Sequence, residues 1–224
     1  MAFRPSSALA AEFDEIAEAE RAVGMAEDLS SAERFIVGKI PAAAGSVVDV
    51  GCGSGRLTRA AARSARRALG VDLSPRMIES ARSRTALGAL IEYRVTDVMT
   101  EELPEAPFDV VLAVSMVHHA PLADAVRRLV DLTAPGGRLL IQDVVDRPGA
   151  RYALLNAAAL VWNILGQPRA ARTVRALYRS HGEGEKYLKP RDVVSSYSSL
   201  LPGAKVYHHV CWRYSIVWTR PLES

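Results

Sequence analysis

The chain has 224 residues, a formal net charge of +3, 49% hydrophobic residues and 24% charged residues. This balance is typical of one globular domain and excludes disorder, collagen-like repeats and a coiled coil as the main architecture. The two cysteines, Cys52 and Cys211, lie far apart in the sequence without clustered partners. They indicate neither a disulfide scaffold nor a zinc site.

Neither the start of the chain nor its longest apolar run indicates a membrane or export. Residues 153–165 form that run, and a helix that spans a bilayer needs roughly 20 apolar residues. Phe3-Arg4-Pro5 is followed by an Ala-rich helix pattern instead of the apolar stretch of a signal peptide. Arginines at helical spacing in residues 56–66 and 169–179 are interpreted as solvated faces. We therefore expect a cytoplasmic protein with no membrane partner and no nucleic-acid partner.

Strands and helices alternate through the first two thirds of the chain. Helices are expected over residues 8–23, 30–40, 56–67, 74–84 and 123–132, and buried strands over 46–50, 68–72, 90–95, 108–114 and 138–145. Nearly apolar strands that alternate with helices are typical of a parallel sheet covered on both faces. Right-handed crossovers then give a doubly wound α/β fold.

The alternation stops after Val145, and residues 148–180 are expected to be mostly helical. The stretch 153–165 is apolar nearly all round, which predicts burial on more than one side. It either packs in the core, forms a contact in a homodimer, or covers an apolar pocket as a lid. A last helix is expected over 192–200, followed by an antiparallel hairpin over 205–211 and 214–220. The chain is thus predicted to be one domain, 1–224, made of N-terminal helices (1–45), a core (46–145), a helical lid (146–190) and a C-terminal helix with a strand hairpin (191–224).

A glycine-rich turn and three aspartates follow the predicted strands. Gly51-Cys52-Gly53-Ser54-Gly55 comes directly after the first strand, with Asp49 just before it. Asp72 ends the second strand, and Asp97 follows the third. Ligands of open parallel sheets bind beyond the carboxyl ends of the strands, where glycine lets them approach backbone amides. These residues therefore predict one ligand site.

Two ligands fit this pattern, a nicotinamide dinucleotide and S-adenosylmethionine. The carboxylate of Asp72 could hold the ribose hydroxyls of either. The dinucleotide pattern G-x-G-x-x-G would place its third glycine at position 56, which is Arg56. Asp49 and Asp97 favour a charged ligand that carries an amino acid. The sequence therefore favours S-adenosylmethionine, and a nicotinamide-dependent oxidoreductase is the alternative enzyme class.

Six segments in order resemble the class I S-adenosylmethionine-dependent methyltransferases, particularly the small-molecule group known as methyltransferase type 11. The matching segments are residues 48–55, 71–74, 95–98, 108–111, 118–119 and 135–140. The resemblance covers residues 46–145 and about 191–220. It implies a Rossmann-like, mostly parallel seven-stranded sheet that ends in an antiparallel hairpin. It also implies S-adenosylmethionine as cofactor and S-adenosylhomocysteine as product.

The resemblance also assigns residues to the parts of the cofactor. Asp49 and the turn with Gly51, Cys52, Gly53 and Gly55 would hold the methionine moiety. Asp72 would bind the ribose, while Leu73 and Met77 would flank the adenine. Asp97 would accept a hydrogen bond from the adenine amino group, with Val98 alongside, and Ser115 would lie near the methionine end.

The acceptor is expected to be a small, partly hydrophobic molecule methylated on oxygen, nitrogen or carbon. The residues Ser115-Met116-Val117-His118 replace the Asn/Asp-Pro-Pro-aromatic signature of amino-methylation. Carboxylates typical of metal-dependent catechol-type enzymes are missing, so no metal is expected. Tyr152, Trp162 and Tyr178 are candidate acceptor-binding residues of the lid. A methyltransferase-like binding protein without turnover is the non-enzymatic alternative.

A general base is expected where the acceptor carries a proton on its nucleophilic atom. His119 is the first candidate, followed by His118 and His181, because imidazole accepts a proton near neutral pH. His118 and His119 come just after the fourth predicted strand, beside the methyl-donating end of the site. The alternative is that one of these histidines only packs or caps the following helix.

Overall fold

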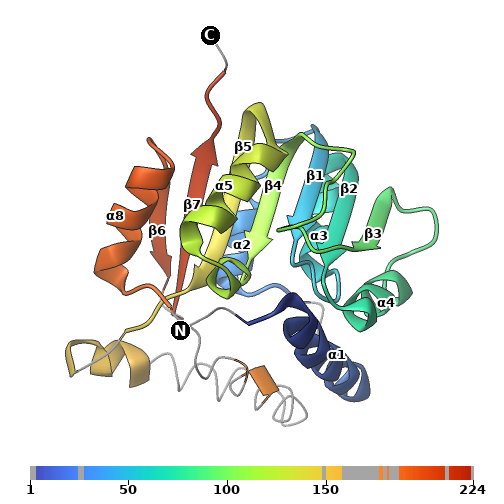
Figure 1. Ribbon diagram of the computed structural model, residues 1–224, viewed down its shortest axis with the longest axis horizontal. Helices are drawn as coiled ribbons and strands as arrows, with labels where there is room; N and C mark the ends of the chain where they lie inside the picture. The colour runs from blue at the N-terminus through green and yellow to red at the C-terminus, as the bar shows by residue number, and fades with distance from the viewer. Residues whose placement is uncertain are drawn as a thin grey trace.

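The computed structural model describes residues 4–24, 28–147, 150–157, 177–178, 181, 187–209 and 212–222. Within these residues, a seven-stranded sheet has the order β3-β2-β1-β4-β5-β7-β6 (Figure 1). The direction of β7 is opposite to that of the other six strands, so its pairings with β5 and β6 are antiparallel and the remaining pairings are parallel. The strands are β1 (Ala44–Val50), β2 (Ala65–Asp72), β3 (Ile91–Val95), β4 (Phe108–Val114), β5 (Thr133–Val144), β6 (Lys205–His209) and β7 (Arg213–Thr219). The mostly parallel sheet and the C-terminal hairpin confirm the predicted Rossmann-like fold.

Helices cover both faces of this sheet. The described helices are α1 (Ser6–Val23), α2 (Ser31–Val37), α3 (Arg56–Ala61), α4 (Pro75–Ser83), α5 (Leu122–Leu132) and α8 (Pro190–Leu200). Val48 and Val111 face α5 and α8 in one core layer, whereas Val47 and Val110 face α2 and α3 in the other. Neighbouring positions on a strand point to opposite faces, which is why these apolar strands are buried on both sides.

Two helices begin as their capping residues predict. Ser30 and Glu33 form a capping box, in which the Ser30 side chain accepts from the Glu33 amide and the Glu33 carboxylate from the Ser30 amide. The Ser74 hydroxyl accepts from the Met77 amide at 3.0 Å, and Pro75 occupies the first turn of α4. Of these two helices, α2 packs against α3, β5 and β7, and α4 packs against β2 and β3.

The prediction of a helix over residues 56–67 is wrong at its C-terminal end. α3 stops at Ala61, a short 3₁₀ turn follows over Ala62–Ser64, and β2 already begins at Ala65. Ala65 pairs with Ala44 and Arg67 with Ser46, so the sheet extends over residues whose arginines suggested a helix face. The segment is rich in Ala and Arg, which favour a helix, but strand pairing outweighs this propensity because tertiary contacts routinely override it.

The first helix, α1, crosses the carboxyl ends of the parallel strands and packs against α4 (Figure 1). Its buried residues Ile16 and Ala17 contact Met77 of α4. α1 therefore covers the edge of the sheet where the glycine-rich turn and the aspartates lie. Most of the predicted lid, 146–190, falls outside the described residues. None of the described helices has the length and apolar character needed to cross a membrane.

Candidate functional site

A cavity of about 730 Å³ opens at the carboxyl ends of the parallel strands. Its walls come from the turns after β1 to β4, from α1, and from Arg213 at the start of β7. Of the residues predicted to form the site, those lining the cavity are Gly51, Cys52, Gly53, Asp72, Leu73, Met77, Asp97, Val98, Ser115, His118, His119, Tyr178 and His181. Asp49, Gly55 and Tyr152 do not line it, and Trp162 lies outside the described residues.

The glycines of the turn have different tasks. Gly53 has φ +52°, and a Cβ there would meet nothing nearer than the Met77 sulfur at 3.9 Å. The turn is therefore open to a ligand at Gly53. Gly55 has φ +77°, and a Cβ there would lie 2.6 Å from the Tyr93 hydroxyl and 2.9 Å from the Ala81 Cβ. Gly55 thus allows close packing of the turn against α4 and β3.

Asp72 ends β2 and holds the glycine turn. Its Oδ2 accepts from the Gly53 amide at 2.8 Å, and its Oδ1 accepts from the Ser74 amide at 2.9 Å. An ionised carboxylate accepts about four hydrogen bonds, so both oxygens retain lone pairs for a ligand in the cavity. Burial, and secondarily the charge of Asp14, raises the pKa of Asp72 above its usual value.

Asp49 lies beneath the turn and is fully buried. Its Oδ2 accepts from the Thr58 hydroxyl at 2.6 Å, whereas its Oδ1 has no hydrogen-bond partner. Burial, with a further contribution from the charge of Asp72, raises the pKa of Asp49 to about 7. A cation bound above the turn would favour the ionised form of this carboxyl group.

Asp97 follows β3 and faces the start of α1. Its Oδ2 accepts from the Ser6 hydroxyl at 2.7 Å, and its Oδ1 accepts from the Met99 amide at 3.0 Å. Val98 beside it is buried, and its carbonyl accepts from Arg128 Nε at 2.7 Å. The sequence placed Asp97 at the strand end but gave no sign that α1 would reach it.

The cavity wall also carries the histidine cluster, which we define as His118, His119 and His181. The ring centroids of His118 and His119 lie 4.0 Å apart, and those of His119 and His181 lie 4.9 Å apart. The Phe13 ring of α1 is in edge contact with His119 and tilted against His181. The fold therefore brings together all three histidines that the sequence selected.

A carboxylate orients each of two rings in the histidine cluster. His118 Nδ1 lies 2.7 Å from Asp143 Oδ1, and the His118 amide donates to Asp143 Oδ2 at 3.1 Å. His181 Nδ1 lies 2.7 Å from Glu12 Oε2, which also accepts from Arg4. Burial opposes ionisation of Glu12, but the hydrogen bonds from His181 and Arg4 outweigh it and lower the pKa of Glu12. Sequence reasoning identified neither carboxylate.

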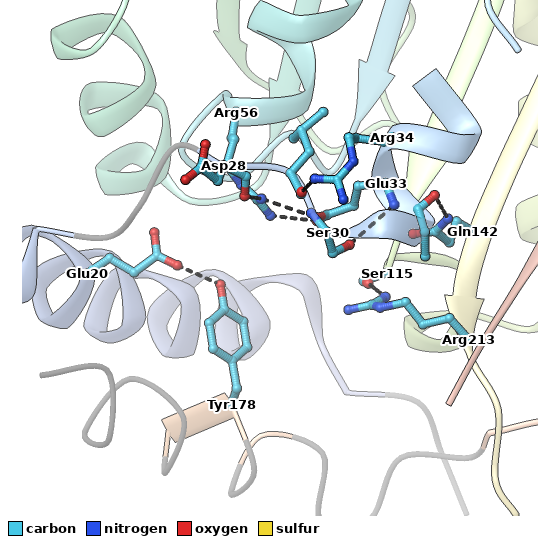
Figure 2. Close-up of polar contacts among 12 residues, drawn as sticks. Glu20, Asp28, Ser30, Glu33, Arg34, Arg56, Ser115, Gln142, Tyr178 and Arg213 are labelled. Atoms are coloured by element: carbon cyan, nitrogen blue, oxygen red, sulfur yellow. Dashed lines mark hydrogen bonds and ion pairs between the residues drawn. The ribbon is translucent and has the colours of Figure 1, made fainter. Parts of the chain in front are cut away.

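Two further polar contacts lie around the cavity (Figure 2). Arg213 donates from Nη1 to the Ser115 hydroxyl at 2.6 Å, where Ser115 has φ +57°. Glu33 of α2 pairs with Arg56, whose Nη1 donates to Glu33 Oε2 at 3.1 Å. Burial opposes ionisation of Glu33, but the charge of Arg56 outweighs it and lowers the pKa of Glu33. These contacts place three charged groups on the cavity wall that sequence reasoning missed.

Tyr178 is the one candidate acceptor-binding residue that the structure places on the cavity wall. Its hydroxyl donates to Oε1 of Glu20, a buried residue of α1, at 2.9 Å (Figure 2). Although 42% of Tyr178 is exposed, desolvation of its hydroxyl and the charge of Glu20 raise the pKa of Tyr178 above its usual value, so this hydroxyl remains a donor. The contact joins the segment after β5 to α1 across the mouth of the cavity.

Comparison with known proteins gives concordant matches. Residues 48–141 match the methyltransferase domain family. An uncharacterized methyltransferase of Mycobacterium tuberculosis is 31% identical over 187 residues, which cover 82% of this chain and 91% of that relative. The ubiquinone biosynthesis O-methyltransferase of Xylella fastidiosa is 34% identical over 125 residues, covering 54% of this chain and 50% of that protein.

A solved structure extends the likeness to nearly the whole fold. The N-methyltransferase NodS from Bradyrhizobium japonicum, in complex with S-adenosylhomocysteine, has a TM-score of 0.61 at 16% sequence identity. The match covers 94% of this chain and 98% of that chain. At this level of identity the likeness concerns the fold alone.

Proposed function

The chain belongs to the methyltransferase domain family as an S-adenosylmethionine-dependent enzyme, and we propose that its acceptor is a small, partly hydrophobic molecule bound beside the histidine cluster. The observation that carries this proposal is one continuous cavity. The glycine turn and Asp72 line one part of it, which we call the cofactor end, and the histidine cluster lines another part, which we call the acceptor end. A donor and an acceptor bound in the same cavity could react without leaving it.

The residues at the glycine turn fit the cofactor. When bound, S-adenosylmethionine supplies a methyl group activated by a positively charged sulfur. The open position at Gly53 leaves room beside the backbone, and Asp49, whose Oδ1 has no hydrogen-bond partner, would ionise and supply negative charge beneath the turn when a cation lies above it. Both features suit a ligand that carries positive charge and must lie close to the main chain.

The cofactor-binding residues on the cavity wall would take the roles that the resemblance implies. Asp72 would accept from the two ribose hydroxyls, Leu73 and Met77 would flank the adenine, and Asp97 would accept from the adenine amino group with Val98 beside it. The turn from Gly51 to Gly53 would receive the methionine moiety. Asp49 and Gly55 act from behind the wall, the first through its charge and the second by letting the turn pack closely. Ser115 would lie near the methionine end, where Arg213 of the acceptor end contacts it.

The acceptor end combines apolar and polar surface. Leu9, Phe13 and Met116 add apolar surface to the cavity as a whole, while Arg213 and the histidine cluster add polar groups. A guanidinium has five N–H donors, and the contact of Arg213 with Ser115 uses one of them. An acceptor with an oxygen-rich group suits this composition. The Xylella fastidiosa relative is named an O-methyltransferase, which supports oxygen as the methylated atom.

An acceptor hydroxyl must lose its proton for its oxygen to attack the methyl carbon. The histidine cluster lies at this end of the cavity, and Asp143 and Glu12 orient two of its rings. We propose that the cluster promotes this loss of the proton. The carboxylate contact makes His118 a better-defined participant than His119, which the sequence ranked first.

A transfer assay with a labelled methyl group tests the proposed function. The full chain is incubated with methyl-labelled S-adenosylmethionine and a panel of small phenols, hydroxy acids and amines. We expect label in at least one hydroxylated, partly hydrophobic acceptor, together with one equivalent of S-adenosylhomocysteine. Tight S-adenosylhomocysteine binding without transfer to any member of a broad panel would favour the binding-protein alternative. Binding of NAD in place of S-adenosylhomocysteine would favour the oxidoreductase alternative.

A further inference from the structure

The three imidazoles of the histidine cluster converge from separate parts of the chain. His118 and His119 belong to the 3₁₀ turn Val117–His119 after β4, and His181 comes from the segment that follows β5. One ring nitrogen from each lies within 4.8 Å of the others. Zinc binds imidazole nitrogen at about 2.0–2.1 Å, which places tetrahedral ligands about 3.3 Å apart. Small ring rotations would therefore bring the three nitrogens to one ion.

The carboxylates behind the cluster match the usual surroundings of a metal-binding histidine. Asp143 contacts His118 through Nδ1, and Glu12 contacts His181 through Nδ1. A metal-binding imidazole commonly donates its second N–H to a carboxylate, which fixes the ring and leaves the other nitrogen for the metal. In both pairs, Nε2 is the nitrogen left for a ligand.

His181 gives an independent indication of a missing ligand. Its side chain is 7% exposed, and its Nε2 is buried without a hydrogen-bond partner. A buried ring nitrogen that lacks a partner is uncommon in a folded protein, because losing its water costs free energy. A cation at the centre of the cluster would supply that partner.

The charges around the cluster favour a cation. The buried carboxylate of Asp143 and the carboxylate of Glu12 lie directly behind two of the rings. Arg4, which pairs with Glu12, carries a positive charge that offsets part of this negative charge. Imidazole is a ligand that suits Zn²⁺, Cu²⁺ and Ni²⁺, whereas Mg²⁺ prefers oxygen. The sequence lacks the carboxylates of metal-dependent catechol-type enzymes, but carboxylates are ligands for ions that prefer oxygen, such as Mg²⁺. Their absence therefore does not argue against an ion that histidines bind.

We propose that His118, His119 and His181 form a binding site for one divalent transition-metal cation of the zinc class in the acceptor half of the cavity. The catalytic role of this site rests on the proposed function. An acceptor hydroxyl bound to the cation loses its proton to water more readily, as zinc-bound water does. The oxygen electron pair then forms the O–C bond as the S–C bond breaks, leaving S-adenosylhomocysteine. The histidines act as ligands, and the cation takes the place of a separate base.

Metal titration of the full chain tests this site without an acceptor. The protein is stripped with a chelator and titrated with Co²⁺, followed by visible absorption, and with Zn²⁺, followed by calorimetry. We expect one ion per chain. His118→Gln and His181→Gln should each weaken binding at least tenfold. His208→Gln is the matched control, because His208 is an exposed residue of β6 outside the cluster and should leave affinity unchanged.

A second pair of variants tests the carboxylate support. Glu12→Gln should weaken Zn²⁺ binding by about 10- to 100-fold through the loss of its contact with His181. Glu18→Gln makes the same change on the same helix, where Glu18 pairs with Arg76, and should have no effect. These variants leave all three ligands in place and so remain informative even where a histidine variant folds poorly.

The opposite results are equally specific. Binding that is equal in wild type, His118→Gln and His181→Gln, or undetectable in wild type, overturns the metal site. Calorimetry of S-adenosylhomocysteine on the metal-free samples separates this failure from a failure of the proposed function. Retained S-adenosylhomocysteine binding without metal binding would overturn the metal site alone. Loss of both would contradict the assignment of the cavity as well.

Discussion

The two ends of the cavity are built in different ways. At the cofactor end, short loops directly after β1, β2 and β3 carry the glycine turn, Asp72 and Asp97. At the acceptor end, the contacts join residues far apart in the chain: 169 positions separate Glu12 from His181, and 98 separate Ser115 from Arg213. The cofactor end is therefore a local consequence of the strand ends, whereas the acceptor end depends on how distant segments meet.

The largest expected effect is a loss of activity when a residue of the acceptor end is replaced. Replacing His118 by Gln removes its contact with Asp143 and its part in the loss of the acceptor proton. We expect kcat to fall by about 10²- to 10⁴-fold, the usual contribution of assisted proton transfer. Steady-state kinetics with the acceptor found in the panel measure this, with His208→Gln as control. A kcat within threefold of wild type would remove the histidine cluster from the reaction.

The cofactor end should be more sensitive to backbone changes. Gly55→Ala places a Cβ 2.6 Å from the Tyr93 hydroxyl at a residue with φ +77°. Strain and overpacking together should cost about 2–4 kcal/mol of unfolding free energy. Gly88→Ala is the control, because Gly88 has φ +83° but open space around it, so only strain applies. Urea unfolding of both variants measures the difference, and equal losses would show that the close packing of the turn is unimportant.

Asp49 should make stability depend on pH. Its pKa is raised from 3.8 to about 7, so the folded chain holds this proton more tightly than the unfolded chain. The stability contributed by the neutral carboxyl group is complete below about pH 4 and is lost as pH rises towards 7. The unfolding free energy of Asp49→Asn should therefore fall by about 1–3 kcal/mol less than that of the wild type as the pH rises. Unfolding curves of both proteins at pH 4.5 and 7.5 test this prediction. If the difference in unfolding free energy between the two pH values is the same in Asp49→Asn as in the wild type, the raised pKa of the buried Asp49 is contradicted.

The smallest effect concerns recognition of the acceptor. Arg213→Gln keeps a donor near Ser115 but removes the charge from the cavity wall. We expect the acceptor KM to rise by about tenfold, the loss of one charge-assisted hydrogen bond, with cofactor affinity unchanged. Arg191→Gln, an exposed change on α8, is the control. An equal loss of cofactor affinity would contradict this assignment and indicate that Arg213 binds the cofactor.

The contrast between the two ends also explains what the sequence could predict. The glycine turn and the aspartates at the strand ends were predictable because the parallel sheet brings all carboxyl ends to one edge. The fold class and the hairpin were predictable for the same reason, since periodicity and turn residues are local signals. The position of His118 and His119 followed from the end of β4.

What the sequence could not predict depends on tertiary contacts. The crossing of α1 over the strand ends, which brings Ser6 to Asp97 and Glu12 to His181, has no local signal. Arg213 reaches Ser115 because the hairpin register places it opposite Val144 at the end of β5. Asp49 and Gly55 lie in the recognised motif, yet only the packing shows that they act from behind the cavity wall.

Calorimetric titration of S-adenosylhomocysteine into matched variants tests the separation of the two ends most directly. Asp72→Ala removes the carboxylate assigned to the ribose, and the loss of two charge-assisted hydrogen bonds should weaken binding at least tenfold. Asp109→Ala is the control, because Asp109 also bonds a backbone amide, that of Ser46, but lies at the amino end of β4. We predict that His118→Gln and Asp109→Ala bind S-adenosylhomocysteine within twofold of wild type. Wild-type affinity in Asp72→Ala, or an equal loss in His118→Gln, would contradict the division of the cavity into a cofactor end and an acceptor end.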